Sequence, residues 1–258
     1  MNSRPVSILL YLVVMWLIVQ LAVNGAASMG YNWQWYRIPQ YILAQTDNGI
    51  QPGELVTGLV RTVDLTVRSF LLAVALGLVV ALLRLSSLVI GVAVATGFLE
   101  FIRNLPLLVL LYLIYYVCGP VFGLDRYTAS IVCLAVYHSV LISEIFRAGI
   151  LAVSAGQWEA AQSIGMSRAQ SYCYIILPQS IRFVLPPLTG EAVHLIKSSA
   201  IVSVIAVAEL TTMGRNIISD TFMSFEVWLT VAAIYLVMTL MLSIFVTRLE
   251  RKFSVASR

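Results

Sequence analysis

The chain carries a polar stretch, EAAQSIG at residues 159–165, between two long apolar runs. Ser154 and Gln157 precede it with the spacing of a capping box, which predicts a short helix beginning near Ala155. Gly165 can adopt the left-handed backbone conformation that commonly ends a helix. The stretch therefore predicts a short polar helix that is distinct from the apolar segments on either side.

The same segment has the composition of a docking surface and not of a catalytic site. Ser167 and Gln170 repeat the capping pattern and predict that a second helix begins at once. Small residues at Ala160, Ala161 and Gly165 predict a low-relief face on the first helix, which lets a groove of another protein approach its backbone. A neighbouring subunit is the expected partner.

Composition identifies the chain as an integral membrane protein. Of its 258 residues, 60% are hydrophobic and only 11% are charged, and the mean hydropathy is +0.93, which is outside the range of soluble domains of this size. Apolar runs long enough for membrane-spanning helices are expected at residues 6–23, 63–83, 88–118, 127–150, 183–208 and 227–247. The expected fold class is all-α, with a break in the overlong third run near Arg103 and Pro106.

The basic residues predict the orientation of the chain in the membrane. With the N-terminus inside, the basic residues of the cytoplasmic segments are Arg4, Arg84, Arg168, Arg182, Arg248, Arg251, Lys252 and Arg258. The outside segments keep Arg37, Arg126 and Arg215. The positive-inside rule therefore predicts that both termini and the loop of residues 151–182 are cytoplasmic. The net charge of +4 is a topology signal, and no nucleic-acid partner is expected.

The first apolar run has two interpretations. Arg4 precedes it and the sequence NGAAS follows at residues 24–28, as in a secretory signal. The run is longer than the usual signal core of about 7 to 15 residues, so a retained helix is favoured. Trp33 and Trp35 in the following linker suit the outer membrane interface, where they would anchor the chain.

No catalytic residue, metal site or nucleotide site is expected. His138 and His194 are isolated, and neither Lys197 nor Lys252 follows a glycine-rich phosphate loop. The chain is therefore not expected to be an enzyme. If it belongs to a primary pump, another subunit must supply the energy.

Charged residues inside the third run have two open interpretations. Glu100 and Arg103 are three residues apart on one helix, so they can form an ion pair that lowers the cost of insertion into the membrane. Alternatively, Arg103 and Asn104 lie next to the break at Pro106 and present a guanidinium and free backbone groups to a substrate carboxylate.

The fourth run carries a small and polar stripe that is expected to face inward. Its members are Ser130, Cys133, Tyr137, Leu141 and Glu144. Helix packing is the favoured use of this stripe over lining a pathway. His138 is expected to be a core histidine with satisfied hydrogen bonds. Glu144 and Arg147 are expected to brace the 151–182 loop.

The fifth run is expected to begin after Pro186 and Pro187, because prolines can start a helix but do not continue one from upstream. It then places on one side Glu191, His194, Ser198 and Glu209. Lys197, at the edge of that side, needs a partner such as Glu191, a carbonyl, water or a ligand. Structural pairing and substrate contact are equal alternatives for this lysine.

The stretch at residues 159–165 resembles the Glu-Ala-Ala loop of bacterial ATP-binding cassette (ABC) importer permeases. FIRNLPLL at residues 101–108, IFRAGI at 145–150 and LPQ at 177–179 are similar to the polar amino acid branch of that family. The resemblance implies a type I ABC importer transmembrane domain, with a MetI-like core of five helices in residues 54–253. An extra N-terminal transmembrane helix and a periplasmic linker would occupy residues 1–53, and a cytoplasmic tail residues 254–258.

The resemblance also implies partners and site residues. Residues 151–182 would be the coupling loop that fits a cleft on the ATPase, with contacts from Gly156, Gln157, Glu159, Ala160, Ala161 and Gly165. The substrate-pathway candidates are Arg103, Asn104, Glu191, His194, Lys197 and Ser198. Two ATPase subunits would bind ATP and Mg, and no cofactor is expected in this chain. A second permease subunit and a periplasmic amino acid binding protein would complete the assembly in the bacterial inner membrane.

Two departures from the family pattern bear on the cargo. The chain has Asn104 and Leu105 where the family often has Gly-Thr, and KSSAI at residues 197–201 in place of Lys-Asp-Thr-Ser-Leu. Both resemble the glutamate/aspartate type, so an acidic amino acid is the expected cargo. The rival hypothesis is an ATP-independent, proton-coupled transporter or channel subunit. Its proton relay would use Glu100, Glu144, Glu191 and His194.

Overall fold

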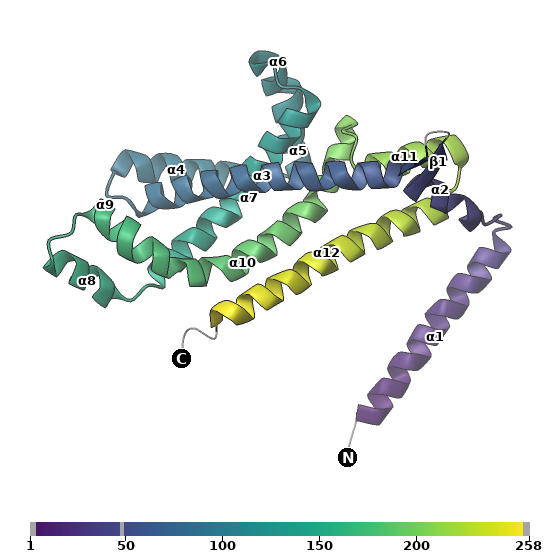
Figure 1. The fold of residues 1–258 in the computed structure, drawn as a ribbon, viewed down its shortest axis with the longest axis horizontal. Helices are drawn as coiled ribbons and strands as arrows, with labels where there is room; N and C mark the ends of the chain where they lie inside the picture. Colours follow the sequence, from purple (N-terminus) through teal and green to yellow (C-terminus); the bar gives the residue numbers. More distant parts are fainter. Residues whose placement is uncertain (1–3, 47–48, 255–258) are drawn as a thin grey trace. The chain divides into compact units, whose positions relative to one another are not determined.

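The computed structural model describes residues 4–46 and 49–254, and the chain divides into two compact units, Met1–Ile38 and Pro39–Arg258. The first unit contains α1 (Arg4–Ser28) and the 3-10 turn η1 (Trp35–Arg37) (Figure 1). Every side chain of residues 8–21 in α1 is exposed, and nearly all of them are apolar. A helix that is apolar on all sides suits a membrane span.

The second unit begins within α2 and holds the remaining elements. They are α2 (Ile38–Ile42), β1 (Leu43–Thr46), β2 (Gly49–Pro52), α3 (Glu54–Leu85), α4 (Val89–Arg103), α5 (Leu107–Tyr112), the π-helix η2 (Leu113–Cys118), α6 (Gly119–Phe122), α7 (Arg126–Leu151), α8 (Ala155–Ser163), α9 (Arg168–Ser171), the π-helix η3 (Tyr172–Ile176), α10 (Leu177–Ser198), the 3-10 helix η4 (Ser199–Ile205), α11 (Leu210–Thr221) and α12 (Ser224–Ser254). The strands β1 and β2 form one antiparallel hairpin. All the other elements are helical, so the prediction of an all-α fold is confirmed apart from this hairpin.

Helix α3 is the centre of the second unit, and it packs along α7. A Cβ added at Gly77 of α3 would lie 2.6 Å from Cγ2 of Ile142 in α7, so this close approach requires glycine. Helix α10 packs against both α7 and α12. In Figure 1, α8 and α9 lie at one end of this unit, and α11 lies at the opposite end. We call these the α8 end and the α11 end.

The predicted spans are confirmed, with one qualification for the third. The described residues contain five helical stretches that are long and apolar enough to cross a membrane: Ile8–Gly25, Glu54–Leu85, Arg126–Leu151, Arg168–Ile205 and Ser224–Arg248. A sixth span results if Val89–Arg103 and Leu107–Phe122 are counted together, although they are bent by 108°. The break predicted near Pro106 is therefore present, and it is much sharper than a kink.

The predicted start of the fifth span is wrong. Helix α10 begins at Leu177 and passes through Pro186 and Pro187. Each proline removes only its own N–H, whereas a non-helical segment inside a membrane would leave many backbone groups unbonded. The Thr189 hydroxyl also donates to the carbonyls of Leu185 at 3.0 Å and Pro186 at 2.7 Å. These bonds lie in the turn that follows the prolines, and they do not replace the two backbone bonds that the prolines remove.

The predicted position of Glu209 on the fifth span is also wrong. Helix α10 ends at Ser198, η4 ends at Ile205, and Ala206 follows with a φ of +56°. This left-handed residue ends the helical run before Glu209, which becomes the N-cap of α11. Glu209 therefore belongs to the α11 end and does not share a helix face with Glu191.

Candidate docking surface and transport groove

The loop of residues 151–182 contains the predicted helix, glycine turn and second helix start. Gly165 follows α8 with a φ of +77°, the left-handed conformation expected for a helix end. Ser167 Oγ accepts the N–H of Gln170 at 3.3 Å, and Gln170 Oε1 accepts the N–H of Ser167 at 2.8 Å. The second predicted capping box is therefore confirmed.

The first predicted capping box is not formed. Helix α8 begins at Ala155 as predicted, but the Ser154 side chain makes no capping hydrogen bond. The Gln157 side chain is used elsewhere, because its Oε1 accepts from Gln179 Nε2 at 2.9 Å. This bond joins α8 to the beginning of α10, across 22 residues of chain.

Helix α8 has an inward and an outward face. Ala161 is completely buried and Trp158 is half-buried, so these two residues face the rest of the unit. Gly156, Glu159 and Ala160 are exposed. The exposed, low-relief face predicted from the small residues is present, but Ala161 is not part of it.

A small cavity separates α8 from the end of α3. Its volume is about 250 Å³, and it is lined by Leu85, Trp158, Gln162, Met166, Arg168, Ser171 and Tyr172. The Trp158 ring meets the Tyr172 ring edge-on, with 4.9 Å between the centroids. This aromatic pair attaches α8 to η3 by packing, while polar groups remain accessible beside it.

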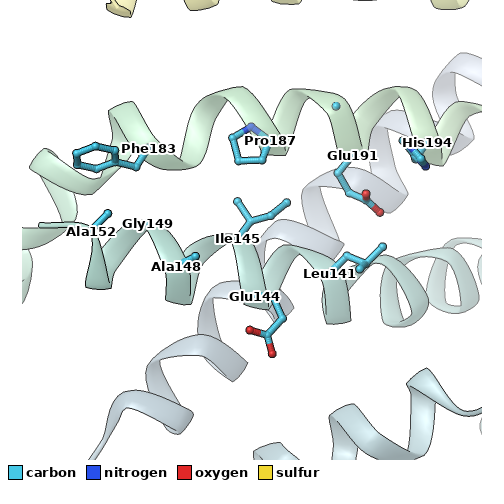
Figure 2. A pocket seen from close by; sticks show the side chains of 11 residues that line it. Leu141, Glu144, Ile145, Ala148, Gly149, Ala152, Phe183, Pro187, Glu191 and His194 are labelled. Carbon is cyan, nitrogen blue, oxygen red and sulfur yellow. The ribbon is translucent and has the colours of Figure 1, made fainter. Parts of the chain in front are cut away.

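A larger groove lies between α7 and α10 (Figure 2). Its volume is about 670 Å³, and it is lined by Leu141, Glu144, Ile145, Ala148, Gly149, Ala152, Phe183, Pro187, Gly190, Glu191 and His194. Figure 2 shows Glu191 pointing from α10 towards α7. Of the predicted pathway residues, the groove brings together Glu191 and His194, whereas Arg103, Asn104, Lys197 and Ser198 do not line it.

Glu191 of α10 is paired with His138 of α7. His138 Nδ1 lies 2.5 Å from Glu191 Oε1, and both side chains are buried. Among the described residues, His138 Nε2 has no hydrogen-bond partner, so the prediction of a satisfied core histidine is only half confirmed. The two residues are 53 positions apart on different helices, and no local sequence pattern indicates the pair.

Lys197 does not pair with Glu191, which was one of the partners considered for it. Its side chain is exposed, and no carboxylate of residues 4–46 and 49–254 lies within ion-pair distance of it. Ser198 Oγ donates to the carbonyl of His194 at 3.0 Å, which is a bond within the helix. In the same described part of the chain, no three His, Cys, Asp or Glu side chains are grouped to hold a metal ion.

Five charged residues from three helices form what we call the Glu144 hub: Arg84, Glu100, Arg103, Glu144 and Arg147. Glu144 Oε1 accepts from Arg84 Nη1 and lies 3.5 Å from Arg103 Nη2, while Oε2 accepts from Arg147 Nε at 2.9 Å. Arg103 Nη1 lies 3.6 Å from Glu100 Oε1, so the ion pair of the first interpretation is present. The contacts of Glu144 therefore join α7 to α3 and α4, and none of those described reaches α8.

The polar groups of the α11 end are buried and bonded to one another. The Glu209 carboxylate accepts the N–H groups of Thr211 at 2.8 Å and Thr212 at 2.7 Å, and the Tyr235 hydroxyl at 3.0 Å. Thr62 of α3 accepts the N–H of the first residue of α11 at 3.1 Å. Burial raises the pKa of Glu209 above its ordinary value, although the hydrogen bonds oppose this.

Comparison with known proteins adds an independent observation. Residues 73–255 match the family described as "Binding-protein-dependent transport system inner membrane component". The "Probable glutamine ABC transporter permease protein GlnM" of Bacillus subtilis (strain 168) is 40% identical over 178 residues, which are 69% of this chain and 82% of that protein. The "Glutamine transport system permease protein GlnP" of Escherichia coli (strain K12) is 34% identical over 204 residues, 78% of this chain and 93% of that protein.

Solved structures agree with the arrangement of the helices. The "Crystal structure of an amino acid ABC transporter with histidines" has a TM-score of 0.71 and 42% identity, covering 77% of this chain and 94% of that chain. One of the "Inward facing conformations of the MetNI methionine ABC transporter" has a TM-score of 0.67 at 20% identity, covering 77% of this chain and 95% of that chain. At that identity the second likeness concerns the fold alone.

Proposed function

This chain belongs to the family of binding-protein-dependent transport system inner membrane components, and from that membership we propose that it is the permease subunit of an ATP-driven importer of a polar amino acid. Its fold is that of a type I ABC importer transmembrane domain. The observation that carries the proposal is α8, a polar helix at one end of the unit with an exposed face of small residues. An exposed face of small residues lets a partner subunit approach the backbone of the helix closely.

The ATPase subunit is the proposed partner of α8. Gly156, Gln157, Glu159 and Ala160 are exposed, so each can contact a cleft on the ATPase. Ala161 would act indirectly, because its burial holds the helix in place. Two ATPase subunits would bind ATP and Mg and serve this chain and a second permease subunit, which is either another copy or a related chain.

The groove between α7 and α10 is the proposed path of the substrate. Glu191 and His194 line it, and Lys197 and Ser198 follow along α10. Of the eleven residues that line the groove, five are alanine, glycine or proline and three are polar, which leaves space for a small ligand beside hydrogen-bonding groups. A periplasmic binding protein would deliver the amino acid to this path.

Arg103 and Asn104 are weaker candidates for the path than the residues of α10. Arg103 already has two carboxylate neighbours, Glu100 and Glu144. Asn104 Nδ2 donates to the carbonyl of Glu100 at 2.7 Å and so satisfies the end of α4. Both side chains are used by the protein itself, which favours a structural role.

Glutamine is the favoured cargo, and glutamate or aspartate is the second candidate. The two relatives described above are named for glutamine transport, and two others are named for nopaline and octopine transport. The groove also contains the carboxylate of Glu191, which would repel an acidic side chain, whereas the charge of Glu144 is already balanced by arginines. The departures at residues 104–105 and 197–201 support the acidic alternative.

The proposed location is the bacterial inner membrane, with both termini on the cytoplasmic side. This orientation follows from the distribution of arginine and lysine, and it places the α8 end in the cytoplasm beside the ATPase. In a chain whose native cysteines Cys118, Cys133 and Cys173 are replaced by serine, a cysteine introduced at Ser163 should then react with a membrane-impermeant reagent only in inside-out vesicles.

Uptake by the reconstituted complex tests the proposal. The chain would be assembled with its candidate ATPase and binding proteins in vesicles, and radiolabelled glutamine, glutamate and aspartate would be offered separately. The proposal expects uptake that requires ATP and the binding protein and that vanadate stops. Uptake that ignores vanadate but disappears with the proton gradient would support the proton-coupled rival.

A further inference from the structure

We propose that Glu144 positions the bend between α4 and α5 relative to α7, and so passes movement of the 151–182 loop to the bent α4–α5 pair during transport. This inference rests on the proposed function, because it requires an ATPase that moves α8. Glu144 would be a positioning residue, since it acts through the arginines of neighbouring helices.

The first argument is that arginines from three different helices contact the carboxylate of Glu144. Its two oxygens face guanidinium groups from α3, α4 and α7, namely those of Arg84, Arg103 and Arg147. With Glu100 beside Arg103, the hub contains three positive and two negative charges. Removing the charge of Glu144 would leave three arginines and one carboxylate, so the mutual position of three helices depends on this one side chain.

The second argument is the place of the hub in the fold. Glu144 and Arg147 lie in the last two turns of α7, which lead directly into the 151–182 loop. Arg103 is the last residue of α4, immediately before the 108° bend to α5. Because a helix is stiff over a few turns, a displacement of the loop reaches the hub through α7 and reaches the bend through Arg103.

The third argument is that Arg103 can exchange partners. Its guanidinium lies 3.6 Å from Glu100 on its own helix and 3.5 Å from Glu144 on α7. Its side chain is 48% exposed, so water can replace either contact. A helix shift of about 1–2 Å is therefore enough to favour one carboxylate over the other. The hub can then adopt two arrangements, as a coupling element requires.

An ion-pair network that only stabilises the fold would behave differently. Arg84 is 22% exposed and contacts Glu144 more closely than Arg103 does, so the loss of Arg84 should cost the most stability. The loss of Arg103 should cost little, because exposed ion pairs contribute little. A role in transmitting movement requires Arg103 in particular, since this residue is at the bend.

The experiment compares Glu144→Gln, Arg103→Gln and Arg84→Gln in the reconstituted complex with its ATPase and binding protein. The measured quantity is amino acid uptake per ATP hydrolysed, after size-exclusion chromatography has established that the complex assembles. We expect Glu144→Gln and Arg103→Gln to lower this ratio about fivefold or more. Arg84→Gln should mainly lower the melting temperature of the complex and leave the ratio close to that of the wild type.

Asp64→Asn is the matched control. Asp64 also binds an arginine and a residue of α7, because it accepts from Arg68 Nε at 2.9 Å and from the Tyr127 hydroxyl. It lies 20 residues before Arg84 on α3, about 30 Å along the helix. The uptake-per-ATP ratio of this variant should equal that of the wild type.

The outcomes separate the inference from the proposed function. A wild-type ratio in both Arg103→Gln and Glu144→Gln would overturn the inference, and so would an equal fall in Asp64→Asn. If Glu144→Gln does not assemble, Arg103→Gln decides, because its exposed side chain is not needed for packing. Absence of ATP-dependent uptake by the wild-type complex would overturn the proposed function, and the inference would fail with it.

Discussion

Polar groups are exposed at the α8 end of the second unit and buried at its α11 end. At the α8 end, Glu159 and Ala160 are exposed on a short helix, and Arg103 of the Glu144 hub is half exposed. At the α11 end, Glu209 is completely buried, and the N–H groups of α11 and the hydroxyl of Tyr235 use its carboxylate. The α8 end leaves polar groups available to a partner, whereas the α11 end uses them to hold α3, α11 and α12 together.

This difference indicates what substitutions should do at each end. A buried polar group must be bonded, so its removal leaves partners unsatisfied and lowers stability. An exposed residue on a short helix contributes little to stability, so its substitution should change binding instead. Four predictions test this division.

The largest effect is expected for Ala161→Arg at the α8 end. Ala161 is completely buried, so an arginine there would place an unpaired charge inside or displace α8, at about 3–5 kcal/mol. Ala160→Arg is the matched variant, because Ala160 is next to Ala161 in the chain but is exposed. Both variants should lose co-purification of the ATPase, but only Ala161→Arg should increase proteolysis of the loop. Retention of the ATPase by Ala160→Arg would contradict the proposed docking face.

A large loss of stability is also expected for Glu209→Ala at the α11 end. The substitution leaves the N–H groups of Thr211 and Thr212 without their acceptor, at about 1–3 kcal/mol for each buried group. The melting temperature in detergent should fall, while binding of the ATPase to the folded fraction should not change. An unchanged melting temperature would show that the α11 end does not depend on this cap.

Replacing a closely packed glycine by alanine should lower the stability of the protein by different amounts at the two ends. A Cβ at Gly58 would lie 2.9 Å from the Cα of Leu210, which is backbone and cannot move aside. A Cβ at Gly149 would lie 2.4 Å from Cγ2 of Val184, and a side chain can shift. Both Gly58→Ala and Gly149→Ala should cost about 1–3 kcal/mol.

We expect Gly58→Ala to lose more stability than Gly149→Ala, as measured by thermal unfolding in detergent. Gly97→Ala provides the control, because no atom lies within 4 Å of a Cβ added at Gly97. It should be neutral or slightly stabilising, since alanine favours helix. A larger loss in Gly149→Ala would mean that Val184 is held as rigidly as the backbone.

The smallest effect is expected for Asp125→Asn at the N-terminus of α7. Hydrogen bonds from Thr128 and from the backbone hold the pKa of Asp125 below its ordinary value of 3.8. A lowered pKa in the folded state contributes stability above that value, and the contribution is lost as the pH falls through the folded-state pKa. The wild type should therefore melt about 1–2 °C above the variant at neutral pH.

Acidification provides the check on this last prediction. The difference in melting temperature between wild type and Asp125→Asn should shrink as the pH falls below 3.8 and through the lower folded-state pKa, because the wild-type carboxylate becomes protonated. Asparagine keeps an acceptor for the same N–H groups, so the comparison isolates the charge. A difference that stays constant with pH would contradict an electrostatic contribution from Asp125.

Features that depend on a few neighbouring residues were predictable. The helix at Ala155, the turn at Gly165 and the capping box at Ser167 follow from local backbone preferences. The membrane class and six apolar runs follow from composition, because transfer into lipid depends on the side chains of each segment. Pro186 and Pro187 are the exception, since the local preference for a helix start is overridden inside a long span.

The sequence by itself determined the class of protein, the spans, the break near Pro106 and the polar helix at the α8 end. Only the tertiary structure decided that His138 meets Glu191, that Arg84 and Arg103 share Glu144, and that Ala161 faces inward. The bonded residues of these pairs are 53, 60 and 41 positions apart. Such contacts depend on how one helix is rotated and displaced against another, and short-range preferences do not specify that register.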